Sequence, residues 1–179
     1  MLSYLKKKNI KIGILGGSFD PPHKGHLAIT NIAIKKLNLD LVIWLVTKKN
    51  PFKKKPYFSI KKRIKLSKTI TKKRGKKINI EYLDNIIDSS HTYDLLNFIK
   101  KFNSNLNIFF LMGADSFVNF HKWYKWKKIS LKCNILVFDR TNYKSKSLES
   151  VAFKRLNNKK LKFIKFKKVN ISSSKLRKI

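Results

Sequence analysis

Two histidines three positions apart follow a glycine-rich turn near the start of the chain, in the stretch ILGGSFDPPHKGHL (residues 14–27). Gly16 and Gly17 would end a strand and let the backbone approach a ligand that a side chain would block. The two prolines after them hold the loop rigid ahead of a helix. His23 and His26 then share one face of the first helical turn, where backbone N–H groups and the helix dipole favour an anion. The stretch therefore predicts a phosphate site with two imidazole donors.

Other sites built on glycine or histidine fit these residues less well. The chain contains no G-x-G-x-x-G dinucleotide fingerprint, and no G-K-[ST] follows the glycines as a P-loop requires. A metal pair would need further ligands, for which His91 and His121 are only scattered candidates. The alternative is that these are ordinary turn glycines and two surface histidines with no ligand. So many unusual residues in one short stretch disfavour that alternative.

The elements that must position these residues follow from the periodicity of the sequence. Short apolar runs alternate with helical patterns, as an open parallel sheet requires. The strands are expected at residues 11–16, 41–46, 78–83, 107–112, 134–139 and 161–166. The helices are expected at residues 24–37, 59–71, 92–102 and 116–130, near 147–156, and from Ser173 onward. We therefore expect the α/β class, as a single Rossmann-like doubly wound parallel sheet with helices on both faces and one domain over residues 1–179.

The expected sheet also predicts where a ligand binds. Ligands of doubly wound sheets lie beyond the carboxyl ends of the strands. Three segments should therefore border one site: residues 16–26, 47–55 and 113–126. The histidine turn belongs to the first of them.

The composition is strongly basic, because 43 Lys and Arg residues against 9 Asp and Glu give a net charge of +34. A polyanion is the first partner to consider. The basic residues are mostly lysine and are spread along the whole chain, so a solvated surface is favoured and no specific nucleic-acid partner is expected. The charge would still concentrate small anionic substrates such as nucleotides near the protein.

The sequence also indicates where the protein works. No run approaches the roughly eighteen apolar residues of a membrane span, and the N-terminus, MLSYLKKKNIKIGIL, does not fit a signal peptide. We expect a cytoplasmic protein with no membrane partner. Cys133 is the only cysteine, which excludes an internal disulfide, and its apolar neighbours predict a buried, reduced thiol without a chemical role.

Two segments at opposite ends of the chain resemble the signatures of one enzyme superfamily. GGSFDPPHKGH (residues 16–26) resembles the [ST]-x-[FY]-[DH]-P-x-H-x-G-H signature of the nucleotidyltransferases, and ISSSKLR (residues 171–177) resembles their I-S-S-[ST]-x-[ILV]-R signature. Between them, SSHTYDLLNFI and FFLMGADSFVNFHKWYKWKKI resemble the bacterial nicotinate-nucleotide adenylyltransferases. That resemblance implies transfer of AMP from ATP to nicotinate mononucleotide, which gives deamido-NAD and pyrophosphate, with Mg²⁺ carried by ATP.

The resemblance also implies a role for each residue that matches a family motif. The residues that act on the triphosphate during catalysis would be His23, His26 and Arg177. The residues that bind ATP would be Gly16, Gly17, Ser18, Phe19, Gly113, Asp115, Ser172 and Ser173. Those that bind nicotinate mononucleotide would be Lys53, Thr92, Trp123 and Tyr124. In the family a tryptophan stacks on the pyridine ring and two backbone amides receive its carboxylate, which here implies Trp123 for the ring and the amides of Thr92 and Tyr124 for the carboxylate.

Some features depart from the family pattern or leave alternatives open. Phe52 stands where the family often has a histidine. Only two residues follow Arg177, so the last helix is too short to be stable on its own, and we expect packing or ATP to hold that arginine. We expect His26 and Arg177 to face ligand phosphates rather than protein groups, and Phe120 and Trp126 to belong to the core. The alternatives are an enzyme that prefers nicotinamide mononucleotide and, from a different class, a basic nucleic-acid-binding protein that has lost catalysis.

Overall fold

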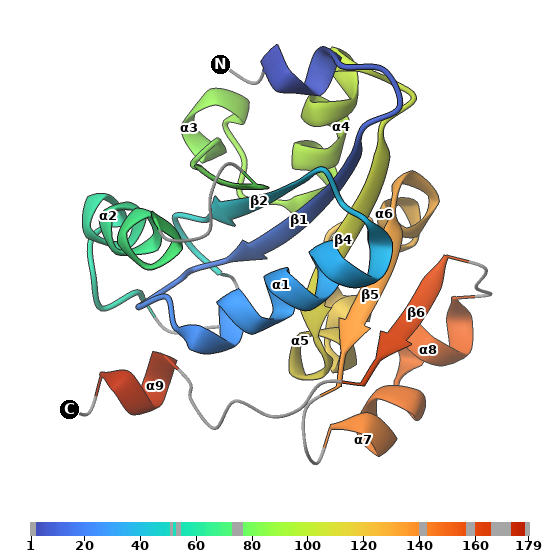
Figure 1. Ribbon diagram of the computed structural model, residues 1–179. Helices are drawn as coiled ribbons and strands as arrows, with labels where there is room; N and C mark the ends of the chain where they lie inside the picture. The colour runs from blue at the N-terminus through green and yellow to red at the C-terminus, as the bar shows by residue number, and fades with distance from the viewer. Residues whose placement is uncertain are drawn as a thin grey trace.

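A six-stranded parallel sheet forms the centre of the molecule (Figure 1). The computed structural model describes residues 3–50, 52, 55–72, 77–139, 143–156, 160–165 and 173–177. The strand order is β3-β2-β1-β4-β5-β6, and every neighbouring pair is parallel. The strands are β1 (Lys11–Gly17), β2 (Leu41–Val46), β3 (Ile78–Glu81), β4 (Asn107–Gly113), β5 (Asn134–Phe138) and β6 (Leu161–Ile164).

The sheet is buried on both faces, as its apolar strands require. All six residues of β2, LVIWLV, are buried, and β4 and β5 are almost as enclosed. Side chains that alternate along each strand divide into two separate hydrophobic clusters. Each cluster needs its own layer of helices.

The helices supply these two layers (Figure 1). One face packs against α1 (Lys24–Leu37) and α2 (Ile60–Thr71). The other packs against α4 (Thr92–Phe102), α5 (Ala114–Val118), α6 (Trp126–Lys132) and α8 (Val151–Arg155). The remaining elements are η1 (Ser3–Lys6), α3 (Asp84–Ile87), η3 (Phe120–Lys122), α7 (Lys144–Leu148) and α9 (Ser173–Leu176). The expected doubly wound α/β fold is confirmed.

One expected helix is wrong. The segment 116–130 forms no single helix: α5 ends at Val118, and α6 begins only at Trp126. Between them Lys125 takes a left-handed backbone conformation, with φ of 50°. Phe117 in α5 and Phe120 in the turn after it are fully buried, so their packing fixes the chain ahead of Lys125. Tertiary packing therefore overrides the helical period and leaves Trp123 and Tyr124 outside any helix.

Several other boundaries differ from the sequence-based expectation. The short helix expected near 147–156 is split into α7 and α8, because Ser150 caps α8 by accepting from the amide of Phe153. The turn of helix α3 was not expected, and β3 and β6 end two residues early. Within the described residues, no helix is both long and apolar enough to cross a membrane.

Candidate active site

The strand order places a crevice beyond the ends of β1 and β4. From β1 the chain winds outward to β2 and β3, and then returns to β4 on the other side of β1. A reversal of this kind is where doubly wound sheets bind ligands. Gly17 ends β1 and Gly113 ends β4, so two predicted ATP-binding residues border the crevice.

The two histidines cap the first helix with one ring nitrogen each. The Nδ1 atom of His23 accepts from the amide of Gly25 at 3.1 Å, and the Nδ1 atom of His26 accepts from the amide of His23 at 3.2 Å. The rings lie 3.9 Å apart between centroids. An accepting Nδ1 carries no proton, so each neutral imidazole has its N–H at Nε2. We expected ligand phosphates rather than protein groups to be the main partners of His26; its Nδ1 atom has a protein partner at the helix start, so that expectation applies only to the Nε2 donor.

The buried ring of Phe19 packs against the ring of His26. The Phe19 side chain is 1% exposed and stacks on Trp44 with a centroid distance of 4.9 Å. The same ring lies 4.8 Å from His26. The Trp44 indole donates to Thr30, whose hydroxyl donates to the backbone carbonyl of His26. The side chain of Phe19 thus belongs to the core, and only its backbone can face a nucleotide.

A buried carboxylate in the same loop joins three segments. Asp20 is 3% exposed, and its two oxygens accept from the amides of Tyr57 and Phe58, each at 2.8 Å. Arg177 donates through Nη1 to the carbonyl of Asp20 at 2.6 Å and to its carboxylate at 3.2 Å. Arg177 therefore has a protein partner, contrary to our expectation. Asp20 lies inside the recognised motif, but nothing in the sequence showed what it would bind.

Helix α9 docks on the loop that precedes α1 (Figure 1). The hydroxyl of Ser173 donates to the carbonyl of Pro21 at 2.8 Å, which adds to the contact between Arg177 and Asp20. The first and second signatures, at opposite ends of the chain, are thus in direct contact. Ser172 and Lys53 lie outside the described residues.

A buried arginine fastens the loops behind the site. Arg63, on α2, is 2% exposed and donates to the carbonyls of Ser18, Thr47, Lys48 and Phe58, at 2.6 to 3.3 Å. Burial lowers the pKa of its guanidinium, and nearby carboxylates oppose that shift. In the sequence it is one basic residue among many, so no signal distinguished it.

A cavity of about 460 Å³ opens beside the ends of β1 and β4, on the side of α4. It brings together Gly16, Gly17, Thr92, Trp123 and Tyr124 from the sequence prediction. The segments expected to border the site also supply lining residues to which no role was assigned: Thr47, Lys49, Asn50, Phe52 and Lys122. The lining residues outside those segments are Ser90, His91 and Phe110. Two of the lining residues are lysines, which favour an anionic ligand.

One end of this cavity combines an aromatic wall with the start of a helix. The ring of Trp123 is half-buried and stands edge-on to Phe110, at a centroid distance of 6.0 Å. Tyr124 is 45% exposed and packs on His91 at 4.8 Å. His91 occupies the N-cap of α4, but its side chain makes no capping bond to the helix. The amides of the first turn, beginning at Thr92, can therefore bind an anion.

The end of β4 completes the crevice on the other side. Gly113 is the N-cap of α5, and the half-buried Asp115 lies in the first turn of that helix. Phe120 is fully buried and Trp126 packs against the same core, as expected. Within the described part of the chain, no cluster of three His, Cys, Asp or Glu side chains could hold a metal ion.

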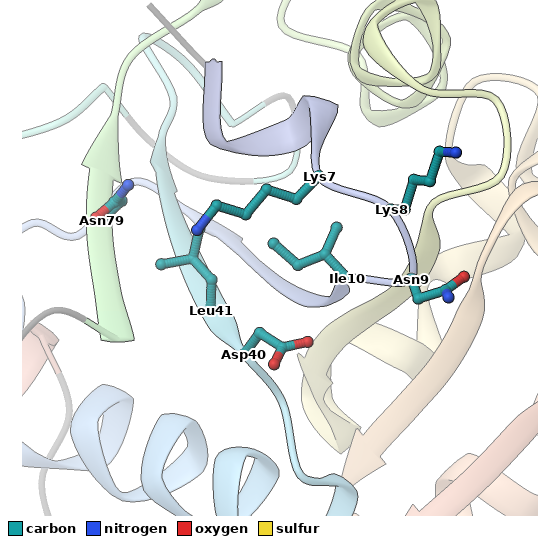
Figure 2. A pocket seen from close by; sticks show the side chains of 7 residues that line it. All are labelled: Lys7, Lys8, Asn9, Ile10, Asp40, Leu41 and Asn79. Atoms are coloured by element: carbon teal, nitrogen blue, oxygen red, sulfur yellow. The ribbon is translucent and has the colours of Figure 1, made fainter.

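A second cavity, of about 330 Å³, lies at the opposite edge of the sheet (Figure 2). It opens at the amino ends of β1 and β2, and its lining residues are Lys7, Lys8, Asn9, Ile10, Asp40, Leu41 and Asn79. The carboxylate of Asp40 is already bonded to the amide of Lys11 at 2.8 Å. The cavity is separated from the histidine turn by the length of the strands.

Comparisons with known proteins agree with this fold. The model of the cytidylyltransferase-like family matches residues 14–179. The chain belongs to this family of nucleotidyltransferases. Several curated proteins similar to it are named probable nicotinate-nucleotide adenylyltransferases. A probable enzyme of this name from Pelagibacter ubique is 53% identical over 98% of this chain and 96% of its own length.

More distant proteins give the same picture. A probable nicotinate-nucleotide adenylyltransferase of a Bradyrhizobium species is 35% identical over 82% of this chain and 76% of its own length. The solved structure of the Plasmodium falciparum nicotinic acid mononucleotide adenylyltransferase, complexed with NaAD, has the same fold, with a TM-score of 0.73 and 24% identity. That alignment covers 95% of this chain and 83% of the other.

Proposed function

We propose that this protein transfers the adenylyl group of ATP to nicotinate mononucleotide, giving deamido-NAD and pyrophosphate in NAD biosynthesis. One observation carries the proposal: a helix start with two imidazole donors shares the ends of β1 and β4 with a cavity that has a tryptophan wall. A reaction between a triphosphate and an aromatic mononucleotide needs these two half-sites side by side. The cytoplasmic location and the single domain remain predictions from the sequence.

The donor half-site would hold ATP across the start of α1. Backbone amides near Gly16, Gly17, Ser18 and Phe19 would face the α-phosphate, while the Nε2 donors of His23 and His26 would bind the triphosphate. Gly113 and Asp115 would bind the nucleoside, Asp115 through a ribose hydroxyl. Ser173, at the start of α9, and Arg177, just after its end, would close the site, together with Ser172. A guanidinium has five N–H donors, so Arg177 can hold Asp20 and a phosphate together.

The acceptor half-site would hold nicotinate mononucleotide in the 460 Å³ cavity. Trp123 would stack on the pyridine ring. The amides of Thr92 and Tyr124 would receive the carboxylate, because the side chain of the N-cap residue His91 makes no capping bond at the start of α4. Lys49 and Lys122 line the same cavity and, with Lys53, would balance the negative charge of the mononucleotide.

The chemistry needs positioning and charge neutralisation more than a basic side chain. An oxygen of the mononucleotide's 5′-phosphate attacks the α-phosphorus of ATP in line, the bond to the bridging oxygen breaks, and pyrophosphate leaves with the electron pair. A phosphate dianion is already a competent nucleophile, so no proton has to be removed. The imidazoles, Arg177 and the helix termini stabilise the charge that develops on the phosphates. Mg²⁺, which we propose enters on ATP, would add to that neutralisation.

Pyrophosphate release tests this proposal and its substrate preference. Purified protein is supplied with ATP, Mg²⁺ and either nicotinate or nicotinamide mononucleotide. We expect the specificity constant for the acid to exceed that for the amide by about tenfold or more, because an NH₂ group in the same pose leaves buried donors unpaired at a cost of ~1 to 3 kcal/mol. Equal specificity constants would contradict the acid preference, and a larger constant for the amide would favour nicotinamide mononucleotide as the substrate.

A further inference from the structure

One carboxylate oxygen, outside the cavity lining, links two of the cavity's walls. The Oδ2 atom of Asp84 accepts from the amide of Lys48 at 2.7 Å and from the hydroxyl of Ser90 at 2.6 Å. Lys48 stands between Thr47 and Lys49, which line the cavity from the segment after β2. Ser90 itself lines the cavity from the segment before α4. These two segments are 36 and 6 residues away from Asp84 in sequence, so no local geometry fixes one against the other.

The segment after β2 has a second attachment. Arg63 donates to the carbonyls of Thr47 and Lys48, so the Lys48 peptide is held at its carbonyl by an arginine and at its amide by Asp84. This wall therefore remains attached to α2 when Asp84 is lost.

The segment before α4 depends more directly on Asp84. Among the described residues, its other hydrogen bonds are local ones: the amide of His91 donates to Ser89, the hydroxyl of Ser89 donates to Asp94, and the amide of Ser89 donates to the backbone carbonyl of Asp84. It also contacts a distant part of the chain through the packing of the His91 ring on Tyr124, which fixes no hydrogen-bond distance. Thr92, whose amide begins α4, follows Ser90 by two residues. A shift of Ser90 would therefore move the open end of α4 relative to the opposite wall.

We propose that Asp84 is a positioning residue for the acceptor, which sets the spacing between the segment after β2 and the start of α4. This inference rests on the proposed function, because it takes nicotinate mononucleotide as the occupant of the cavity. Asp84 itself touches no substrate. Its action is through the Lys48 amide and the Ser90 hydroxyl, both charge-assisted bonds that are stronger than neutral ones.

The electrostatic effect of Asp84 has the opposite sign to its positioning effect, and this makes the two separable. Removing a negative charge near a cavity for an anion raises the local positive potential, so charge alone would lower the KM for nicotinate mononucleotide. Loss of the two bonds would raise that KM, because binding would then have to order the wall. The direction of the change therefore identifies the role.

The experiment measures steady-state constants for Asp84→Ala, Asp84→Asn and Asp88→Asn beside the unchanged protein. Asp88 is exposed at the end of the same short helix α3, and asparagine tolerates its left-handed backbone, so this variant is a matched control for charge. For Asp84→Ala we expect the KM for nicotinate mononucleotide to rise about tenfold, the size of one net hydrogen bond to a charged acceptor. The KM for ATP and kcat should change less than about twofold.

The two asparagine variants sharpen the result. Asp84→Asn keeps an acceptor oxygen without the charge and should raise the KM for the acceptor by about threefold, which is a partial rescue. Asp88→Asn should leave that KM unchanged or lower it. A KM in Asp84→Ala that is unchanged or lowered, or kcat and both KM values that worsen together, would overturn the positioning role. If the unchanged protein transfers no adenylyl group to nicotinate mononucleotide, the proposed function fails instead, so the two failures are distinguishable.

Discussion

The two nitrogens of the His26 ring have different proposed roles, and a substitution can remove one role while keeping the other. Nδ1 accepts from the His23 amide as part of the helix cap, and the proposed phosphate donor is Nε2. In His26→Asn the side-chain oxygen stands where Nδ1 stood, so the cap is kept and the donor is lost. We expect turnover to fall about a hundredfold to a thousandfold, as for other donors to developing charge, with the free energy of unfolding lowered only by the lost packing of the ring on Phe19, about 1 kcal/mol.

The alanine variant is the comparison that makes this result informative. His26→Ala loses both nitrogens, so it should lose the same turnover and, beyond the loss in His26→Asn, about 1 kcal/mol more of stability from the missing cap. Urea unfolding without ligand and pyrophosphate release at saturating substrates give the two quantities. Normal turnover in His26→Asn would show that Nε2 has no part in catalysis.

The structure brings the predicted site residues together where neighbours in the chain become neighbours in space. His23 and His26 share one helical turn, and Trp123 and Tyr124 reach one cavity end from adjacent positions. Asp20 lies in the same motif, yet its partners come from the segment before α2 and from the residue after α9, so no spacing could identify them. Asp84 and Arg63 are of common types in unremarkable positions, and their roles exist only in the folded chain.

Helix α2 supports the site through Arg63, whose guanidinium donates hydrogen bonds to four backbone carbonyls that water would otherwise have to satisfy. In Arg63→Met these buried acceptors lose their donors, so we expect the free energy of unfolding to fall by about 3 kcal/mol or more. Arg63→Lys should recover less than half of that loss, since one ammonium cannot reproduce the planar fork. Urea unfolding measures both variants.

Lys61→Met is the matched control for this change. Lys61 is exposed on the same helix, so its replacement should alter the free energy of unfolding by about 0.5 kcal/mol or less. A similar small loss in Arg63→Met would mean that water satisfies the four carbonyls and that the arginine does not fasten the loops.

At the scale of elements, apolar runs predicted the sheet and amphipathic periods predicted most helices. The strands of a parallel sheet are buried on both faces, so their sequence signal is strong. For the segment 116–130 the helical periodicity gave a wrong prediction, because the aromatic side chains that produce the pattern pack in the core without forming one helix. The break in that segment is also what brings Trp123 and Tyr124 to the cavity, so the failed expectation lies at a proposed functional position.

The net charge of +34 is spread over the whole molecule and should raise the rate at which anionic substrates encounter the protein. Both proposed substrates are anions, so kcat/KM for ATP should fall as salt is raised from about 0.01 M to about 0.5 M, where the Debye length shrinks from ~30 Å to a few ångströms. The value of kcat should change little, because the bound substrates are held at short range. Initial rates at low ATP and at saturating ATP measure the two constants.

The same series tests the nucleic-acid alternative. Binding of duplex DNA by a lysine-rich surface is counterion release and should disappear across this salt range without sequence preference. Tight, sequence-selective retention of DNA or RNA at physiological salt would support that alternative, and a salt-independent kcat/KM would remove the steering role of the charge.

The contact between Arg177 and Asp20 joins residues 157 positions apart, and synthesis therefore completes it last. A ribosome that adds roughly 5 to 20 residues each second makes Asp20 on the order of ten seconds before Arg177. By the end of that interval the growing chain contains every strand of the sheet, the histidine turn and the residues of the acceptor cavity. A product ended by a premature stop codon or trimmed by a protease before α9 would keep these parts and lack the arginine. Such a fragment would sequester the mononucleotide without converting it, so loss of a few terminal residues would create a competitor of the intact enzyme for its substrate.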